Sequence, residues 1–466
     1  MNSETRLKHI ENLKPYGKTE IRWEDDLKTM DIYKIPLEYL IYNKYNGRIL
    51  SRTKSLEKQD RIIDAETDDG KQLIAKLLWD SKKDRNEKTE LSLKKYGQEK
   101  IGIVTKDGII IDGNRRAMLL NKIDKYDYFK AVVLPVRLDE NPLEIERLET
   151  SHQMGEDKKL DYNPIEKYIK VKEIMKKLAS TCNEDEAKNK IHEWMNEPLP
   201  EIQKYIDVMD TMDDYLNSLE YDGIYTQLDG REDHLISLTK WKNSFLNNED
   251  NPPTATGSKK AFDGYEADDV DDLQNIAYDY IRARYEGKEF RKLSEGQSDK
   301  HLFGDEKIWE SFKDKHFEEI NLLLDSEVEI DFNSQNLDAH LKDRDNTYKR
   351  NIEDFLKRNL NEYYQLVNNK KYKNEPEKLI KNAKRSIESI GQNHSLLDSD
   401  LVQNEIKDLN ETINSLLLKS PLKTLEYVTG LLTDIVITDS DDGDKIYEEV
   451  SNINKLSFDL KKRLGG

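Results

Sequence analysis

Residues 101–121 read IGIVTKDGIIIDGNRRAMLLN. The runs IGIV and III are rich in β-branched side chains, and the pair Asp107-Gly108 lies between them. An Asp-Gly pair between two such runs predicts a β-hairpin. Asp112-Gly113-Asn114 then ends the second strand, and residues 115–123 are expected to form a helix. The segment therefore predicts a strand that leads directly into the start of a helix.

Five polar or small residues stand at this junction: Asp112, Gly113, Asn114, Arg115 and Arg116. The first N–H groups of a helix have no partner inside the helix and lie at the positive end of its dipole. A glycine lets the backbone approach a ligand closely, and arginines supply planar charged donors. The pattern is typical of a phosphate site. The alternative is a capped helix start with two surface arginines.

The sequence around the junction predicts a small domain of strands and helices over residues 31–140. Residues 131–136 form a buried apolar run, and residues 70–79 have apolar side chains at helical spacing. Alternation of this kind indicates an α/β or α+β domain. From residue 141 onward the pattern is helical. We therefore expect an α+β protein, with a small α/β head followed by a large, mostly α-helical region.

Composition shifts suggest five segments. They are an N-terminal lead (1–30), the head (31–140), a helical domain (141–250), an acidic linker (251–272) and a helical C-terminal region (273–466).

The charge of the chain argues against a general nucleic-acid binder. Of 466 residues, 75 are Lys or Arg and 94 are Asp or Glu, so the net charge is −19. Non-specific DNA affinity depends on neutralising phosphates with Lys and Arg. Residues 341–390 are the exception, because they hold 13 basic and 8 acidic side chains. That segment is either a solvated helix face or a contact for nucleic acid.

Cysteine usage and hydropathy indicate the compartment. Cys182 is the only cysteine, which excludes an intrachain disulfide and a multi-cysteine zinc site. The first 16 residues contain no apolar signal region, and no run of about 18 apolar residues predicts a membrane span. We expect a cytoplasmic protein of bacterial or phage origin that does not engage a membrane.

Motifs on both sides of the junction resemble the N-terminal nucleotide-binding domain of the ParB/sulfiredoxin superfamily, over about residues 31–215. In the order of the chain they are Ile35-Pro36-Leu37, Asn43 to Arg48, Asp112 to Arg116, Glu149-Thr150-Ser151-His152-Gln153 and Asn163-Pro164-Ile165-Glu166. ParB-type proteins bind CTP with magnesium and act as a switch or a slow nucleotidase.

The resemblance implies a role for each matching residue. Gly113, Arg115 and Arg116 would hold phosphates, with Asp112 and Asn114 beside them, and Arg48 would lie near the nucleotide. Glu149 matches the family's metal-binding glutamate. Asn163 and Glu166 match the trailing half of the same motif, although Glu166 could instead close a capping box.

Several positions depart from the family pattern. Asn114 stands where sulfiredoxin has its reactive cysteine, so that chemistry is set aside. Thr150 and His152-Gln153 stand where ParB has Asn and Gln-Arg. The ligand implied is therefore Mg²⁺ with either CTP or ATP. The motif is also similar to one in relatives encoded in bacterial DNA-modification and phage-defence operons.

The helices expected at 183–195 and 200–217 occupy the place of the ParB helix-turn-helix. The second of them is rich in carboxylates, which phosphate would repel. We expect this degenerate pair to serve as a scaffold or a protein interface.

Three functions follow, of different classes. The first is a ParB-like nucleotide-binding switch or slow NTPase in partition, plasmid or phage maintenance, or phage defence, with a protein partner or a second copy of the chain. The second is a nuclease or restriction subunit, if the carboxylates of Asp112, Glu149 and Glu166 converge. The third is a non-enzymatic adaptor with a degenerate head. DNA would be reached through a partner or through residues 341–390.

Overall fold

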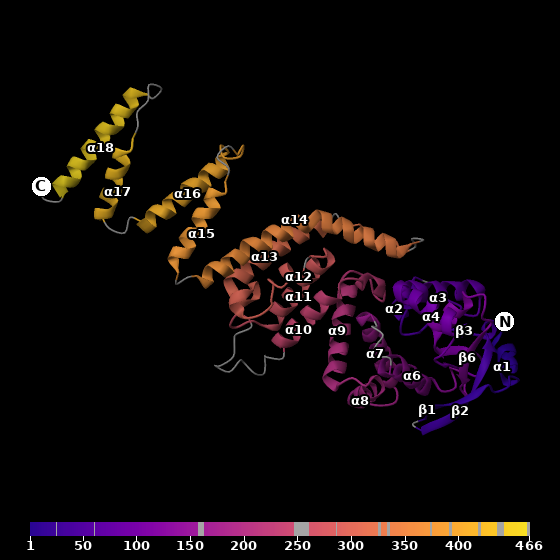
Figure 1. Ribbon diagram of the computed structural model, residues 1–466. Coiled ribbons are helices and arrows are strands. Elements are labelled where there is room, and N and C mark those ends of the chain that lie inside the picture. Colours follow the sequence, from indigo (N-terminus) through magenta and orange to yellow (C-terminus); the bar gives the residue numbers. More distant parts are fainter. Residues whose placement is uncertain are drawn as a thin grey trace. The chain divides into compact units, whose positions relative to one another are not determined.

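The computed structural model describes the chain except residues 25, 60, 157–162, 247–260, 286, 325–327, 333–335, 373–374, 391–393, 418–420, 436–441 and 464–466. It divides into two compact units, Met1–Asn374 and Glu375–Gly466. The first unit holds a mixed sheet with helices, followed by a large helical region (Figure 1). The α+β class expected from the sequence is confirmed.

The head is built on a six-stranded sheet with the order β1-β2-β6-β4-β5-β3. Pairs β3–β5 and β4–β6 are parallel, and the other neighbours are antiparallel. The strands are β1 (Gly17–Trp23), β2 (Asp26–Pro36), β3 (Ile41–Tyr42), β4 (Gly102–Val104), β5 (Ile109–Asp112) and β6 (Tyr128–Val133). The predicted hairpin is β4–β5, and the strand expected at 131–136 is β6, which starts three residues earlier.

Five helices belong to the head: α1 (Ser3–Glu11), α2 (Leu50–Lys58), α3 (Asp68–Ser81), α4 (Lys83–Tyr96) and α5 (Asn114–Asn121). Apolar side chains are buried on both faces of the sheet, which explains the continuous run Ile109-Ile110-Ile111. Ile110 packs with residues of α3, α4 and α5. Ile111 faces the other core, which contains Leu148 of α6 (Pro142–Thr150).

The head begins earlier than the sequence predicts. Residues 1–30, expected as a lead, contain α1, β1 and the start of β2. Trp23 on β1 is fully buried, and the Arg6 guanidinium is buried against the Asp107 carbonyl. The alternation of β1 is weak in sequence because its other side chains are polar and exposed or half-buried.

The helical part of the first unit comprises α6 to α14. After α6 come α7 (Pro164–Leu178), α8 (Glu184–Met195), α9 (Leu199–Ser218), α10 (Glu232–Leu246), α11 (Ala267–Arg282), α12 (Gly287–Phe290), α13 (Glu306–Leu324) and α14 (Leu337–Lys371). The expected caps are present, because Asn163 and Asn183 each accept a bond from a first-turn N–H. Of the expected 251–272 linker, residues 251–260 lie outside the described residues, and its acidic end is the first turn of α11.

A buried ionic cluster lies inside this helical part. Asp345 of α14 pairs with Arg231 and Arg282, and it accepts a hydrogen bond from the Tyr221 hydroxyl at 2.9 Å. The side chains of the three charged residues are at most 5% exposed. Because they come from α14, the start of α10 and the end of α11, the cluster ties distant segments together.

The second unit consists of α15 (Pro376–Glu388), α16 (Asp400–Leu417), α17 (Pro421–Thr433) and α18 (Gly443–Arg463). None of its described residues is buried. The region expected as one piece, 273–466, is therefore divided: α14 packs into the core of the first unit, and α15 to α18 belong to the second. No described helix is both long and apolar enough to cross a membrane.

Candidate functional site

The Asp112–Arg116 segment forms the strand-to-helix junction that the sequence predicts. β5 ends at Asp112, Gly113 has a φ of +103°, and α5 begins at Asn114. An L side chain rarely adopts that backbone conformation. A Cβ on Gly113 would lie 2.6 Å from Cζ of Phe129 and 3.0 Å from Nη2 of Arg116. Glycine is therefore required here by both its torsion angle and its surroundings.

Replacing Gly113 with alanine is expected to lower the free energy of unfolding by about 1–3 kcal/mol. Gly264→Ala is the matched control, because Gly264 also has a positive φ of +84° but nothing within 4 Å of its Cβ position. Urea unfolding of both variants checks this. Equal losses would show that the contact with Phe129 is unimportant.

Arg116 is held inside the junction. Its Nη2 donates to Oδ2 of Asp112 at 2.8 Å, and both side chains are less than a fifth exposed. Asn114 is also held: its Oδ1 accepts from the backbone N–H of Asn43 at 2.8 Å, and its Nδ2 donates to the carbonyl of Ile110. Asp112, Arg116 and Asn114 therefore fix the shape of the junction.

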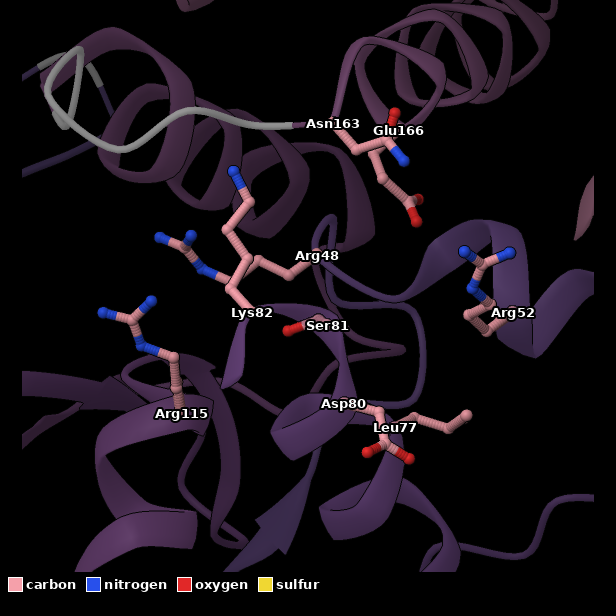
Figure 2. Close-up of a pocket in the computed structure, with 9 residues that line it drawn as sticks. All are labelled: Arg48, Arg52, Leu77, Asp80, Ser81, Lys82, Arg115, Asn163 and Glu166. Carbon is pink, nitrogen blue, oxygen red and sulfur yellow. The ribbon is translucent and has the colours of Figure 1, made fainter. Parts of the chain in front are cut away.

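A cavity beside the junction brings four of the predicted residues together. It has a volume of about 340 Å³ and is lined by Arg48, Arg52, Leu77, Asp80, Ser81, Lys82, Arg115, Asn163 and Glu166. Figure 2 shows the cationic ends of Arg48, Lys82 and Arg115 on one side of this cavity, with Arg52 and Glu166 on the other. We call this cavity the cationic pocket.

A smaller cavity of about 50 Å³ lies directly at the junction. Its lining includes the five junction residues Asp112 to Arg116 together with Asn46, Arg48 and Gln153. Arg48 and Arg115 line both cavities. The two cavities are therefore neighbours and together make one candidate site, to which Arg48, Arg115, Asn163 and Glu166 all contribute.

The sequence analysis missed one wall of the cationic pocket. Asp80 and Ser81 are the last residues of α3, and Lys82 stands between α3 and α4 with a φ of −157° and a ψ of 77°, outside the helical region. Arg52 comes from the first turns of α2. The basic run Lys82-Lys83 was a weak signal, because nothing in the local sequence shows that this break faces the junction.

Glu166 joins the head to the helical part. Its carboxylate accepts hydrogen bonds from the backbone N–H of Ser51 at 2.9 Å and from the Ser51 hydroxyl at 2.5 Å. Ser51 is in the first turn of α2, and the residue before that helix, Ile49, has no side chain that could cap it. Glu166 therefore caps α2 from another helix instead of closing a capping box with Asn163. Burial raises the pKa of Glu166 to about 7.

This raised pKa makes stability depend on pH. Between the unfolded value of 4.5 and about 7, the folded protein keeps a proton that the unfolded chain has released. Raising the pH through this window therefore lowers the free energy of unfolding, by on the order of 3 kcal/mol in total. Glu166→Gln removes the titrating group and preserves the shape.

We expect the stability difference between wild type and Glu166→Gln to shift in favour of the variant as pH rises from 4.5 to 7. Urea unfolding across that range measures it. Parallel curves for the two proteins would mean that the pKa of Glu166 is the same in the folded and unfolded protein.

Glu149, the expected metal ligand, is buried against a lysine. Its Oε2 lies 3.2 Å from Nζ of Lys170, and its Oε1 accepts from Nε2 of Gln153 at 3.0 Å. Burial raises the pKa of Glu149, and the Lys170 charge opposes that rise. A magnesium ion prefers several oxygen ligands, but no group of three or more metal-ligating side chains occurs in the described part of the chain. The residues around Glu149 do not fit a magnesium site.

The three carboxylates that a nuclease would need do not share a cluster. Asp112 is paired with Arg116, Glu149 with Lys170, and Glu166 with Ser51. Each carboxylate therefore has its own partner.

The acidic helix α9 packs inside the first unit. Asp207 accepts hydrogen bonds from Gln203 and Asn243, and Asp213 pairs with Lys172. These contacts join α9 to α7 and α10.

Comparison with known proteins gives one named likeness. The chain is similar to a ParB-N domain. The solved structure is described as "Structure of the C2221 form of Pnob8-like ParB-N domain", with 12% sequence identity, 59% of this chain and 96% of that chain covered, and a TM-score of 0.32. No protein-family model matches the chain, and no curated protein matches it.

Proposed function

We propose that the chain is a nucleotide-binding switch whose ligand places its phosphates between the junction and the cationic pocket. The observation that supports this is the grouping of Arg48, Lys82 and Arg115 beside the start of α5. Arginine and lysine side chains next to a helix start are suited to a phosphate chain. The cavity of about 340 Å³ is within the usual size of small-molecule sites.

Helix α2 offers a physical route from this site to the helical part. Its first turn is capped by Glu166, which lines the cationic pocket. Farther along α2, Arg52 pairs with Asp229, and the Ser55 hydroxyl accepts from the backbone N–H of Thr226. A ligand that shifts Arg52 or Glu166 would therefore change contacts with residues 225–229.

The switch is tested by hydrogen exchange with and without nucleotide. We expect protection in residues 46–55 and 111–118, where the ligand would bind, and a change at residues 225–229. Protection at the pocket without any change at 225–229 would leave binding intact and contradict the coupling. Identical exchange with every nucleoside triphosphate would contradict the proposal itself. Phosphate release measures whether slow hydrolysis accompanies binding.

A partner for the second unit belongs to the same proposal. Ile406, Leu409, Ile413 and Leu416 recur at helical spacing on α16, and each is at least 38% exposed. Helices that form no buried core of their own gain stability from covering such a face. We propose that a second copy of the chain covers it, as the motif resemblance to ParB-type proteins, which usually dimerise, implies.

Adding two carboxylates to this face is expected to convert a dimer into a monomer. The variant is Ile406→Glu with Ile413→Glu, and the control is Asn404→Glu with Ser415→Glu, on the opposite side of α16. Light scattering after size exclusion gives the mass. A monomeric wild type, or a dimer that survives the double variant, contradicts this interface.

The other two functions are less well supported. The separately paired carboxylates argue against a nuclease, and cleavage of supercoiled plasmid in magnesium or manganese would reverse that view. In α15, Lys378, Lys381 and Lys384 pair with neighbouring glutamates, so a DNA contact there is not part of the proposal. A role in partition, in plasmid or phage maintenance, or in phage defence is proposed from the motif resemblance alone. An adaptor role predicts a bound protein partner and no nucleotide.

A further inference from the structure

The carboxylate of Glu149 already faces a cation that belongs to the protein. Lys170 of α7 places its ammonium 2.5 Å from Oε1 of Glu146 and 3.2 Å from Oε2 of Glu149. All three side chains are at most 6% exposed. Removing one partner of such a buried ion pair is costly, because the remaining charge is left without compensation. We therefore expect the Lys170 ammonium to stay beside Glu146 and Glu149 in the folded protein.

The side-chain amides around Glu149 also favour an anion without a metal. Nδ2 of Asn43, Nδ2 of Asn46 and Nε2 of Gln153 lie 3.4, 3.5 and 3.0 Å from Oε1 of Glu149. The Gln153 Nε2 also donates to the carbonyl of Ile111, which fixes the orientation of that amide. Amide N–H groups directed at the carboxylate occupy positions where a divalent cation would need oxygen ligands.

The amides around Glu149 lie next to the Asp112–Arg116 junction. Asn46 and Gln153 line the small cavity together with Gly113 and Arg116. The position corresponds to the place where the motif resemblance puts a magnesium ion. Lys170 offsets the charge of Glu149 and Glu146 there, and the positive charge that faces the pocket comes from Arg48, Lys82 and Arg115.

We infer that Lys170 replaces the divalent metal, so that the pocket binds its phosphate ligand without magnesium. This inference rests on the proposed nucleotide site and adds to it the way in which the ligand charge is balanced. It also accounts for the burial of Glu149, because a glutamate that ligated an exchangeable metal would need access from the ligand side.

The first test is a calorimetric titration of the full chain with CTP and with ATP, in excess EDTA and in millimolar magnesium. The inference predicts that the Kd for a nucleotide that binds differs by no more than about threefold between the two conditions. Binding that disappears in EDTA overturns it. If none of CTP, ATP, GTP and UTP binds in either condition, the proposed function fails as well.

The second test follows the metal itself and needs no nucleotide. Mn²⁺ is titrated into wild type and Glu149→Gln, and free Mn²⁺ is measured by electron paramagnetic resonance. We expect the same Mn²⁺ binding in both proteins. Additional Mn²⁺ bound by wild type and lost in Glu149→Gln overturns the inference, whatever the nucleotide result.

Lys170→Met gives the converse experiment. Without the Lys170 ammonium, Glu149 loses its ion-pair partner and Glu146 keeps only Lys177, so a divalent cation can neutralise the remaining negative charge and the affinity for Mn²⁺ should rise at least tenfold. Folding is checked by circular dichroism. If this variant does not fold, the wild-type Mn²⁺ titration still decides the question. A folded variant with unchanged Mn²⁺ affinity contradicts the assigned role of Lys170.

Discussion

Replacing Arg115 with alanine is expected to weaken nucleotide binding by about 10- to 100-fold, the loss of one or two hydrogen bonds to a charged group. Arg115 lines both the junction cavity and the cationic pocket, so its guanidinium is positioned to reach the phosphates from either. Its side chain is half-buried on α5 and donates to the Thr89 hydroxyl at 3.3 Å. We therefore expect the free energy of unfolding to change by less than about 1 kcal/mol.

Calorimetry and urea unfolding of the same variant separate binding from folding. Arg291→Ala is the control, because that side chain is 62% exposed and lies outside both cavities. Arg116→Ala is less informative, since it also leaves the Asp112 carboxylate without its ion pair. If Arg115→Ala binds nucleotide as tightly as wild type does, the phosphate site is wrongly placed.

Replacing Asp345 with asparagine is expected to cost about 3–5 kcal/mol of stability, as for other buried ion pairs that lose one partner. The change keeps the size of the side chain and removes the carboxylate that pairs with Arg231 and Arg282. Two buried guanidinium groups would then lack that charge. The large cost follows from burial, since ion pairs on a protein surface contribute at most about 1 kcal/mol.

Asp343→Asn is the matched control for this prediction. Asp343 lies on the same helix and is exposed. Thermal and urea unfolding of the two variants measure the difference. A loss no larger for Asp345→Asn than for Asp343→Asn would show that the cluster contributes little to the stability of the helical part.

Local signals were enough to predict most of the elements. The Asp107-Gly108 pair predicted the hairpin, and Asn163-Pro164 predicted the first turn of α7. Both predictions were possible because turns and helix caps depend on a few adjacent residues. The junction at Asp112–Arg116 followed for the same reason. Strand β1 was missed because only two of its side chains are buried.

The candidate site was only partly predicted because it depends on contacts between residues that are far apart in the sequence. Glu166 contacts Ser51, which is 115 positions away, and Lys82 reaches the pocket from a break between two helices. Lys170 lies 21 residues after Glu149, and a lysine on a helix is expected on the surface. Its burial depends on how α7 packs against α6, which the sequence pattern does not show.

The measurement that tests the central claim most directly is a calorimetric titration of the full chain with CTP, ATP, GTP and UTP, each with and without magnesium. The account predicts that at least one of them binds in both conditions, and that Arg115→Ala weakens that binding at least tenfold while Arg291→Ala does not. Failure of all four nucleotides to bind the folded wild-type protein would contradict it and favour the adaptor role.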